Sequence, residues 1–459
     1  MLEKIREERY AAIAERVGGN TGKRLVEALR DFYEIFDEDM IDWFAGLYDP
    51  RFGGWYYSNG AKNLETVTYQ GVTYPLWPDI ESTEQALRFI ATSGLTAGKK
   101  YAEVLPERMK RDIAKYLKGL QDEGGFFYNP QWGKEYTDKK LSRRARDLGA
   151  SVSVLKALGY APTYDTPTGE KGDYRLFDGT TVKRKEMEVS AEGKTASSGG
   201  IEIPDNMRDK ESFLAYLDTL DIKNCAYPVG NTLTAQKRQI MFRDEQLKAE
   251  GADYSLMEIL INWLNENQNP ENGLWNPESN YYGINGLMKI SGVYGAAGML
   301  LPNAEKAANA AIDAMNTSEE AGAVTSVYNT WFAAERVLRH IRTYGGDLGV
   351  ESSAKLLEHL RERAPEALLA TKEKLLPFKK ESGSFSYCLK ASSARSQGCP
   401  VTHENMWEGD INATIICSSD ILSYVFASLG LSDIRVPIFG EKQMQRYIEI
   451  VNNNYEKCK

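Results

Sequence analysis

Residues 121–128 read Gln121-Asp122-Glu123-Gly124-Gly125-Phe126-Phe127-Tyr128, a polar turn that ends on glycine and then on aromatic rings. Three further stretches have the same order of residue types: 49–57, 268–275 and, more weakly, 381–387. The second glycine of the first copy, Gly54, lies 71 residues before Gly125, and Gly273 lies 148 residues after it, close to two such periods. Gly383 follows after 110 residues, which fits this period poorly. A chain with 39 Gly and 26 Tyr can also produce such turns by chance.

Amphipathic helical patterns lie around these turns. Apolar residues recur every three or four positions in 107–120, 256–264 and 444–451, as on one face of a helix. Two antiparallel helices cannot bury both apolar stripes alone, whereas hairpins stacked around a ring bury them and bring the turns to one end. A glycine after a helix can adopt positive φ, and the next aromatic ring fills the space between neighbours. The sequence therefore predicts an all-α fold, an (α/α) toroid or barrel of helical hairpins in one domain, 1–459; for Gly54 it predicts positive φ.

One segment departs from the helical pattern. Residues 160–215 contain several prolines and glycines, and Asp178-Gly179 stands between two short β-favouring runs, which is a hairpin signal. We expect an irregular, β-hairpin-containing insertion here. It could be a lid over a site or a surface excursion, and long loops in compact domains are more often functional.

Composition excludes several classes of protein. The net charge of −9 disfavours a nucleic-acid-binding module, which needs a concentrated basic face. No apolar run approaches the ~18 residues of a membrane-spanning helix, and the charged start of the chain lacks a signal sequence, so we expect a cytoplasmic protein. The five cysteines are irregularly spaced and form no disulfide framework or metal clamp. Aromatic residues make up 11% of the chain, which suits stacking on sugar faces, although a large core would also use them.

The glycine-aromatic turns resemble known enzymes. The copies at 121–126 and 268–275 resemble the glutamine-to-tryptophan repeats of terpenoid cyclases. All four are similar to the turns of the broad (α/α) toroid group, which includes six-hairpin glycosidases, toroidal polysaccharide lyases and sugar epimerases. This resemblance is specific for architecture rather than chemistry, and the members named act on carbohydrates. The Asp-x-Asp-Asp motif of terpenoid cyclases is missing from the sequence.

The first polar segment of chemical interest is 77–84. Asp79 and Glu81 stand at a predicted helix start beside Trp77, where they would either cap the helix or present carboxylates to a pocket.

The second segment is 280–294, continued by 328–331. Tyr282, Asn285 and Lys289 are spaced to share one face of a helix, and that combination is unusual for either a solvated or a core face. The continuation adds further candidates for the same site: Tyr328, Asn329 and Trp331.

The third segment is 403–414, a loop that leads into a helix. It contains His403, Trp407, Glu408 and Asp410. Asp410 could simply cap the following helix. Cys399 and His403 are spaced like two zinc ligands, but no further ligands accompany them, so we predict no metal.

A basic run at 143–146 precedes another predicted helix. Within it, Arg144 is a candidate for a bidentate grip on a carboxylate or sulfate; the alternative is a solvated helix start. The sequence has no nucleotide-binding, serine-hydrolase or thermolysin-type zinc motif, so we predict no cofactor.

These residue types favour cleavage of a glycan. In β-elimination, Asn or Arg neutralises a uronate carboxylate and Tyr or His removes the C5 proton; the candidates are Tyr282, Asn285, Tyr328, Arg144 and His403. In hydrolysis, two carboxyl groups flank the bond; the candidates are Asp79, Glu81, Glu408 and Asp410. We favour elimination on a uronate-containing saccharide. An epimerase or isomerase, a terpenoid-cyclase-like enzyme and a non-catalytic binding toroid remain alternatives. Each enzymatic reading requires the three segments to meet at one cavity.

Overall fold

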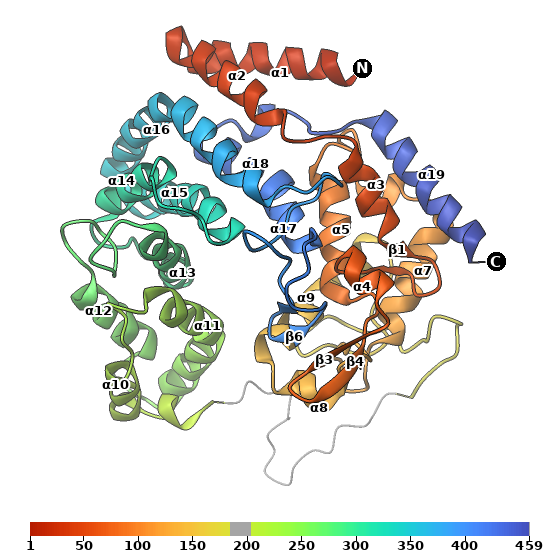
Figure 1. The fold of residues 1–459 in the computed structure, drawn as a ribbon. Coiled ribbons are helices and arrows are strands. Elements are labelled where there is room, and N and C mark those ends of the chain that lie inside the picture. Colours follow the sequence, from red (N-terminus) through yellow and green to blue (C-terminus); the bar gives the residue numbers. More distant parts are fainter. Residues whose placement is uncertain (184–202, 459) are drawn as a thin grey trace.

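The computed structural model describes residues 1–183 and 203–458, and most of them are helical (Figure 1). The N-terminal half contains α1 (Leu2–Val17), α2 (Gly19–Tyr33), α3 (Asp39–Gly46), α4 (Asn59–Asn63), α5 (Ile80–Thr92), α6 (Tyr101–Val104), α7 (Glu107–Gly119), α8 (Gly133–Asp138) and α9 (Leu141–Ala157). The rest contains α10 (Lys210–Asp218), α11 (Ala226–Ala249), α12 (Leu256–Asn267), α13 (Tyr281–Ala297), α14 (Ala304–Met315), α15 (Val324–Tyr344), α16 (Gly346–Leu375), α17 (Ile411–Ile415), α18 (Ile421–Ser428) and α19 (Glu441–Lys457). The prediction of an all-α fold is confirmed at this level.

The strands are short and form three separate antiparallel pairs. These are β1 (Tyr48–Asp49) with β2 (Gly54–Trp55), β3 (Thr66–Tyr69) with β4 (Val72–Pro75), and β5 (Arg395–Ser396) with β6 (Cys399–Pro400). The β3–β4 hairpin turns through Gln70 and Gly71, both at positive φ, and the sequence analysis did not predict it.

The segment predicted as an insertion is only partly irregular. Asp178-Gly179 does form a tight turn, closed by a bridge between Arg175 and Thr181. The prediction is wrong at its C-terminal end, because a 3₁₀ turn covers Asp205–Met207 and α10 begins at Lys210, where the Asp209 carboxylate caps the helix. Residues 184–202 of the segment lie outside the described residues, so its role as a lid stays a prediction.

The four predicted turns each lie between two helices. They follow α3, α7, α12 and the short 3₁₀ turn after α16, and they lead to α5, α9, α13 and α17. In each turn one glycine has positive φ: Gly53, Gly125, Gly273 and Gly383. The prediction of positive φ at Gly54 is therefore wrong, because its neighbour Gly53 takes that conformation while Gly54 pairs with Asp49 in a β-ladder.

The turn glycines are also points of close packing. A Cβ on Gly125 would lie 2.1 Å from the Asp165 carbonyl oxygen, and one on Gly273 would lie 2.7 Å from the Asn303 carbonyl oxygen at the start of α14. Only glycine can bring a turn this close to the next segment of backbone. The repeat thus fixes how each helical hairpin meets its neighbour.

The glutamines of two turns also hold their turn close to the next segment of backbone. The Gln121 amide donates to the carbonyls of Gly125 and Tyr164 and accepts from the Tyr164 N–H at 2.9 Å. The Gln268 amide donates to the carbonyls of Gly273 and Pro302 at 2.9 and 2.7 Å. Each glutamine therefore ties its own turn to the start of the following segment.

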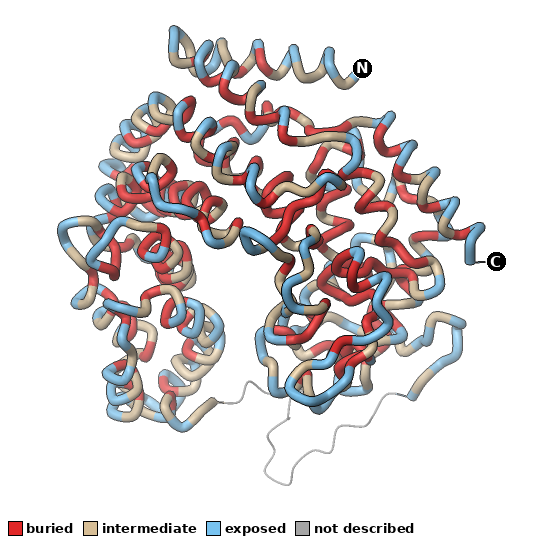
Figure 2. Tube along the Cα trace, viewed as in Figure 1, coloured by how far each residue is buried: buried red, intermediate tan, exposed pale blue. Residues whose placement is uncertain are grey.

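A succession of helices packs side by side through the middle of the molecule. α9 packs on α5, α5 on α17, α18 on α15, α15 on α13, and α13 on α11. The other helices lie against the outside of this succession: α14 and α16 pack on α15, α2 packs on α16, and α19 packs on α3 (Figure 1). Buried positions follow the helix faces turned toward this packing, while α1 keeps mainly half-buried and exposed residues (Figure 2).

The most deeply buried of these helical stretches is Ile411–Ser428, made of α17, a π-helical turn at Ile416–Asp420, and α18. Within the described part of the chain it alone is long and apolar enough to cross a membrane, and most of it is buried inside the molecule. Burial of that kind is typical of a core helix.

Candidate functional site

A fully buried charge cluster lies where α5 and α9 begin. The Arg143 guanidinium reaches three carboxylates: Asp79 at 2.8 Å, Glu81 at 3.0 Å and Asp147 at 2.9 Å. The Trp132 ring covers the guanidinium at 4.4 Å. We call Asp79, Glu81, Arg143 and Asp147 the Arg143 cluster; burying so much charge is tolerable only because every member is paired.

Asp79 acts at two levels in this cluster. It caps α5, accepting from the Ser82 N–H at 3.0 Å and the Ser82 hydroxyl at 2.6 Å, and it pairs with Arg143. It is 1% exposed. Its geometry is therefore that of a cap and a counterion, with no free lone pair directed at a cavity.

The pKa values in the cluster diverge. Burial raises the pKa of Asp147 to about 7, against the opposing pull of Arg143. The pKa of Glu81 is lowered, because the charges of Arg143 and Arg146 outweigh its burial. Glu81 is therefore a fixed negative charge at neutral pH, whereas Asp147 is the member of the cluster that titrates.

Glu81 connects this cluster to a cavity. Its Oε1 binds the Arg146 guanidinium at 2.7 Å, while its Oε2, which binds Arg143, also accepts from the Ser396 hydroxyl at 2.6 Å. A cavity of about 240 Å³ opens between α5 and α9, lined by Glu81, Glu84, Gln85, Arg88, Arg146, Gly149, Ala150 and Ser153. The half-exposed Arg146 thus stands at the edge of open space while its inner neighbour Arg143 is buried.

Two residues from other helices face Arg146. The Lys289 ammonium on α13 lies 5.7 Å from the centre of the Tyr227 ring on α11. Burial lowers the pKa of Lys289, and the positive charges of Arg146 and Arg336 lower it further. The charge of Arg146 also acts on the Tyr227 phenol, whose pKa burial raises. Helices α9, α11, α13 and α15 therefore direct polar groups to one region, although α9 and α11 are not an extensively packed pair.

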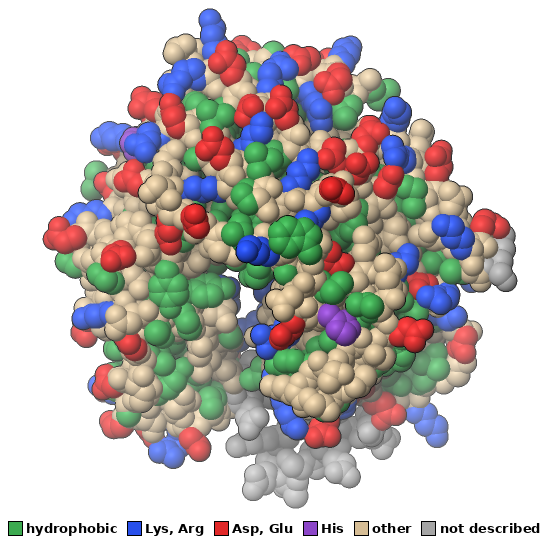
Figure 3. All heavy atoms as spheres, in the orientation of Figure 1, with side chains coloured by type: hydrophobic (Ala, Val, Ile, Leu, Met, Phe, Trp, Pro, Cys, Tyr) green, Lys and Arg blue, Asp and Glu red, His purple; other side chains and the backbone are tan. Residues whose placement is uncertain are grey.

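These cations lack a full set of counterions. Lys289 has no carboxylate partner among the described residues, and neither has Arg336, which donates to the Met288 carbonyl at 2.7 Å and lies over Phe332. Arg146 shares Glu81 with Arg143. We call Arg146, Tyr227, Lys289 and Arg336 the central cluster. Figure 3 shows this face hollowed between α11 and α13 on one side and the β5–β6 hairpin on the other, with basic side chains at the rim.

The same cavity has an acidic side. Arg88 on α5 lies 3.3 Å from Glu84 and 2.5 Å from Asp420, which ends the π-helical turn. Burial raises the pKa of both carboxyls. The aromatic rings of Tyr328, Phe332 and Tyr424 pack together beside this group, with Phe332 and Tyr424 stacked at 4.1 Å.

The second predicted segment is brought only partly to this region. Asn285 and Lys289 share a face of α13, and the Asn285 carbonyl accepts from the Asn329 amide at 2.8 Å. Tyr328 is half-buried near Asp420, whose charge helps raise the pKa of its phenol. Tyr282 lies elsewhere: it is 38% exposed, and its titratable neighbours are Cys225 and Asp221.

The carboxylates of the third segment act as caps. Asp410 is fully buried, caps α17 through the Ala413 N–H at 2.8 Å, and accepts from the Tyr387 N–H at 3.0 Å. Burial raises its pKa to about 7. Glu408 accepts from the Ser58 hydroxyl and the Gly60 N–H at 2.7 and 2.6 Å, which fixes α4. Neither carboxylate has a free oxygen to offer a substrate in this structure.

The remaining predicted residues are scattered. His403 binds the Thr66 carbonyl at 2.7 Å, and Trp407 is 69% exposed beneath the Lys380 ammonium. Trp77 lies at the surface against Phe52. Arg144 pairs with Asp138 at 3.1 Å on another face of α9 from Arg146. Trp331 is fully buried and donates to Thr371, so it packs between α15 and α16 where no saccharide could reach it.

The sequence analysis overlooked Arg146, Tyr227, Arg336 and Glu84. A signal for one of them existed, because Arg143, Arg146 and Asp147 are spaced at i, i+3 and i+4 and share a helix face. Tyr227 and Arg336 stand in ordinary amphipathic stretches, and only the packing of α11, α13 and α15 brings them together.

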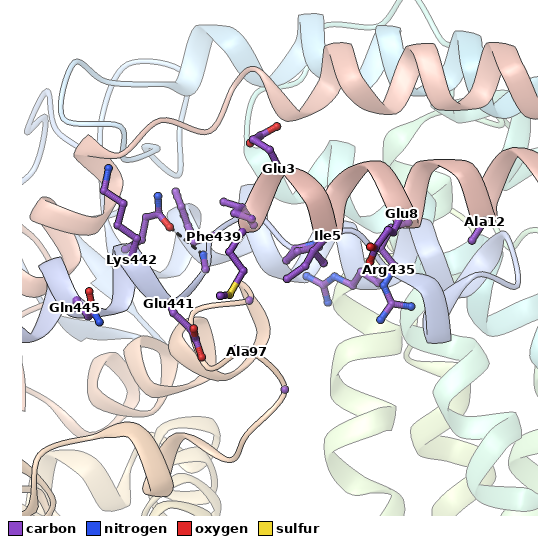
Figure 4. Close-up of a pocket in the computed structure, with 18 residues that line it drawn as sticks. Glu3, Ile5, Glu8, Ala12, Ala97, Arg435, Phe439, Glu441, Lys442 and Gln445 are labelled. Carbon is purple, nitrogen blue, oxygen red and sulfur yellow. Dashed lines mark hydrogen bonds between the residues drawn. The ribbon is translucent and has the colours of Figure 1, made fainter.

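A larger cavity lies away from these groups. A space of about 860 Å³ separates α1 from the turn at 94–98 and the 435–445 segment (Figure 4). Two of the arginines around it are already engaged: Arg9 binds the Asp433 carbonyl, and Arg435 binds Ser423 and the Ser419 carbonyl. Because few free polar groups converge there, we place the candidate site at the central cluster.

Among residues 1–183 and 203–458, no three His, Cys, Asp or Glu side chains are grouped as metal ligands would be. In comparisons with known proteins, no family model, no curated protein and no solved structure matches this chain.

Proposed function

We propose that the protein is a carbohydrate-active enzyme that cleaves an anionic, uronate-containing saccharide at the central cluster. The observation that carries this proposal is that Arg146, Lys289 and Arg336, from three helices, lie close enough for the charges of Arg146 and Arg336 to lower the pKa of Lys289, while of these three only Arg146 has a carboxylate partner among the described residues. Positive charges that lie close together repel one another, which costs free energy. An anionic ligand would neutralise these charges, so the arrangement favours its binding.

The proposal includes the ring that the sequence predicts. The succession from α9 through α5, α17–α18, α15 and α13 to α11 would form the inner helices of an (α/α) toroid, and the cavity would lie on its axis. The helices that begin after these turns would start around one opening of the toroid. That arrangement would explain why residues from distant parts of the chain face the same space.

β-Elimination needs two things from the protein. First, a cation must neutralise the uronate carboxylate so that the C5 proton becomes acidic; we assign this role to Arg146 and Lys289. Second, a base must take that proton. The electron pair then forms the C4–C5 double bond, the C4–oxygen bond breaks, and the leaving oxygen takes a proton from an acid.

Two side chains suit these proton transfers. Burial raises the pKa of Glu84, which makes its carboxylate a stronger base in the cavity. The Tyr227 phenol, whose pKa burial raises, is protonated at neutral pH and can donate to the leaving oxygen. We assign Glu84 as base, Tyr227 as acid, and Asn285 as a polar neighbour that orients the substrate.

The test is incubation with a panel of polyuronates and neutral glycans, following the ultraviolet absorbance of an unsaturated uronate. We expect absorbance to rise with a polyuronate. R146Q should raise KM, and E84Q should abolish turnover while polymer binding persists. K156Q removes an exposed charge from the same helix and should leave both parameters unchanged. No absorbance change with any polyuronate would contradict elimination.

Hydrolysis is the second candidate function. A carboxyl with a raised pKa, such as Glu84, also suits a general acid, and Asp420 is close to it through the shared Arg88. New reducing ends without ultraviolet absorbance would select hydrolysis over elimination.

A further inference from the structure

A second group of aromatic and basic side chains surrounds the β5–β6 hairpin. The Arg395 guanidinium lies 5.3 Å from the centre of the Tyr69 ring, and its Nη1 donates to the Tyr69 hydroxyl at 3.1 Å. Tyr69 is the last residue of β3, so the two short hairpins meet here. Arg395 itself is exposed.

The other side of the β5–β6 hairpin repeats this combination. The Tyr136 hydroxyl donates to the Gly398 carbonyl at 3.0 Å, and the Lys140 ammonium lies 5.4 Å from the centre of the Tyr136 ring. The Tyr74 ring packs edge-on against Tyr136 at 5.5 Å. An aromatic ring with a cation over one face therefore lies on each of two sides of the hairpin.

The two cations of this group do not form ion pairs with carboxylates of the described residues. Neither Arg395 nor Lys140 has a carboxylate within ion-pair distance among the described residues, and the acidic group whose charge acts on Arg395 is the exposed Glu404. A guanidinium and an ammonium held at fixed positions by aromatic rings are available to an anionic ligand.

The hairpin is also joined directly to the cavity. Ser396, the residue after Arg395, donates to Glu81 at 2.6 Å, and Glu81 binds Arg146 of the central cluster. A chain bound at Arg146 could therefore continue onto the hairpin without crossing unrelated surface.

We propose that Tyr69, Tyr136, Lys140 and Arg395 form a second subsite, which binds neighbouring sugar units of an anionic saccharide chain whose cleaved unit lies at the central cluster. Tyr69 and Tyr136 offer stacking faces, while Arg395 and Lys140 bind carboxylate or sulfate groups. This inference rests on the proposed function and adds to it that the enzyme prefers polymers over short oligosaccharides.

The test measures binding, so it does not depend on turnover. Affinity electrophoresis in pectate, alginate and hyaluronate gels would compare the wild type, an R395Q/K140Q double variant and K139Q. The control, Lys139, is a neighbouring exposed lysine that pairs with Glu135. Titration with the corresponding disaccharides would report on the central cluster alone.

We expect R395Q/K140Q to weaken polymer binding roughly tenfold, the loss of one or two charge-assisted contacts, with disaccharide affinity unchanged. K139Q should bind both like the wild type. Unchanged polymer binding by the double variant, or an equal loss for the disaccharide, would overturn the second subsite and leave the proposed function standing. Failure of the wild type to bind or cleave any of the polymers would overturn both.

Discussion

At the scale of single residues, the Arg143 cluster is the most unusual feature. One fully buried guanidinium serves three buried carboxylates, and a second arginine, Arg146, reaches Glu81 from the cavity side. The sum is one negative charge more than the two arginines balance. A proton on Asp147 would remove that excess, in keeping with its raised pKa.

This proton makes stability depend on pH. The Asp147 carboxyl titrates at about 7 in the native state and at 3.8 as a model group, so between these values the native state holds a proton that the unfolded chain releases. The associated stability is full below pH 3.8 and is lost as pH rises through about 7. Thermal melts from pH 5 to 8 should show decreasing stability. Since Asp410 titrates similarly, D147N should flatten the slope only partly, whereas D313N, at a largely exposed carboxyl, should not change it. An unaltered slope in D147N would contradict the assignment.

The turn glycines allow a matched test at the same scale. Gly125 and Gly159 have nearly equal φ, 82° and 83°, but a Cβ would meet the Asp165 carbonyl oxygen at 2.1 Å in the first and nothing within 4 Å in the second. G159A should cost about 1–2 kcal/mol of unfolding free energy from left-handed backbone strain alone. G125A should cost at least ~2 kcal/mol more, because the backbone must move. Denaturant titration measures both values, and equal losses would contradict the close packing of the turn.

At the scale of elements, the repeat of turns was predictable because its chemistry is local. The sequence shows a glycine followed by an aromatic residue in each turn, and it shows the apolar stripes of the flanking helices. Which of two adjacent glycines takes positive φ was not legible: Gly53 does so because residues 48–49 and 54–55 pair as strands. The β3–β4 hairpin was missed for a related reason, because only one of its turn residues is glycine.

The hydrogen bonds by which Gln268 joins its turn to the next segment also act between elements. Gln268 is buried and serves the carbonyls of Gly273 and Pro302, and its own oxygen accepts from Asn303. Q268A would leave these buried groups without partners, at a cost of about 2–4 kcal/mol of unfolding free energy. Q445A, at an exposed glutamine on α19, should have little effect. Chemical denaturation of both variants would check this, and a wild-type midpoint for Q268A would show that the tie contributes little.

At the scale of the whole molecule, the candidate site depends on which helices pack together, and the sequence alone does not predict that packing. Of the three polar segments predicted to meet at one cavity, two have a residue near Arg146: Glu81, which pairs with it and lines the cavity, and Lys289, whose pKa its charge lowers. Asp79, Tyr282 and His403 do not meet: they are held by Arg143, by the start of α11 and by β3. Helix starts attract Asp and Glu as caps, so the carboxylates most visible in the sequence were the ones already committed to structure.

An anionic sugar is proposed to bind at the central cluster, beside Arg146 of α9 and Lys289 of α13. The most direct measurement is a crystal structure of the E84Q variant soaked with an oligouronate that the wild type binds. We expect a carboxylate of the sugar within hydrogen-bond distance of both Arg146 and Lys289. An oligosaccharide found instead in the cavity beside α1, or bound without contact to either cation, would contradict it.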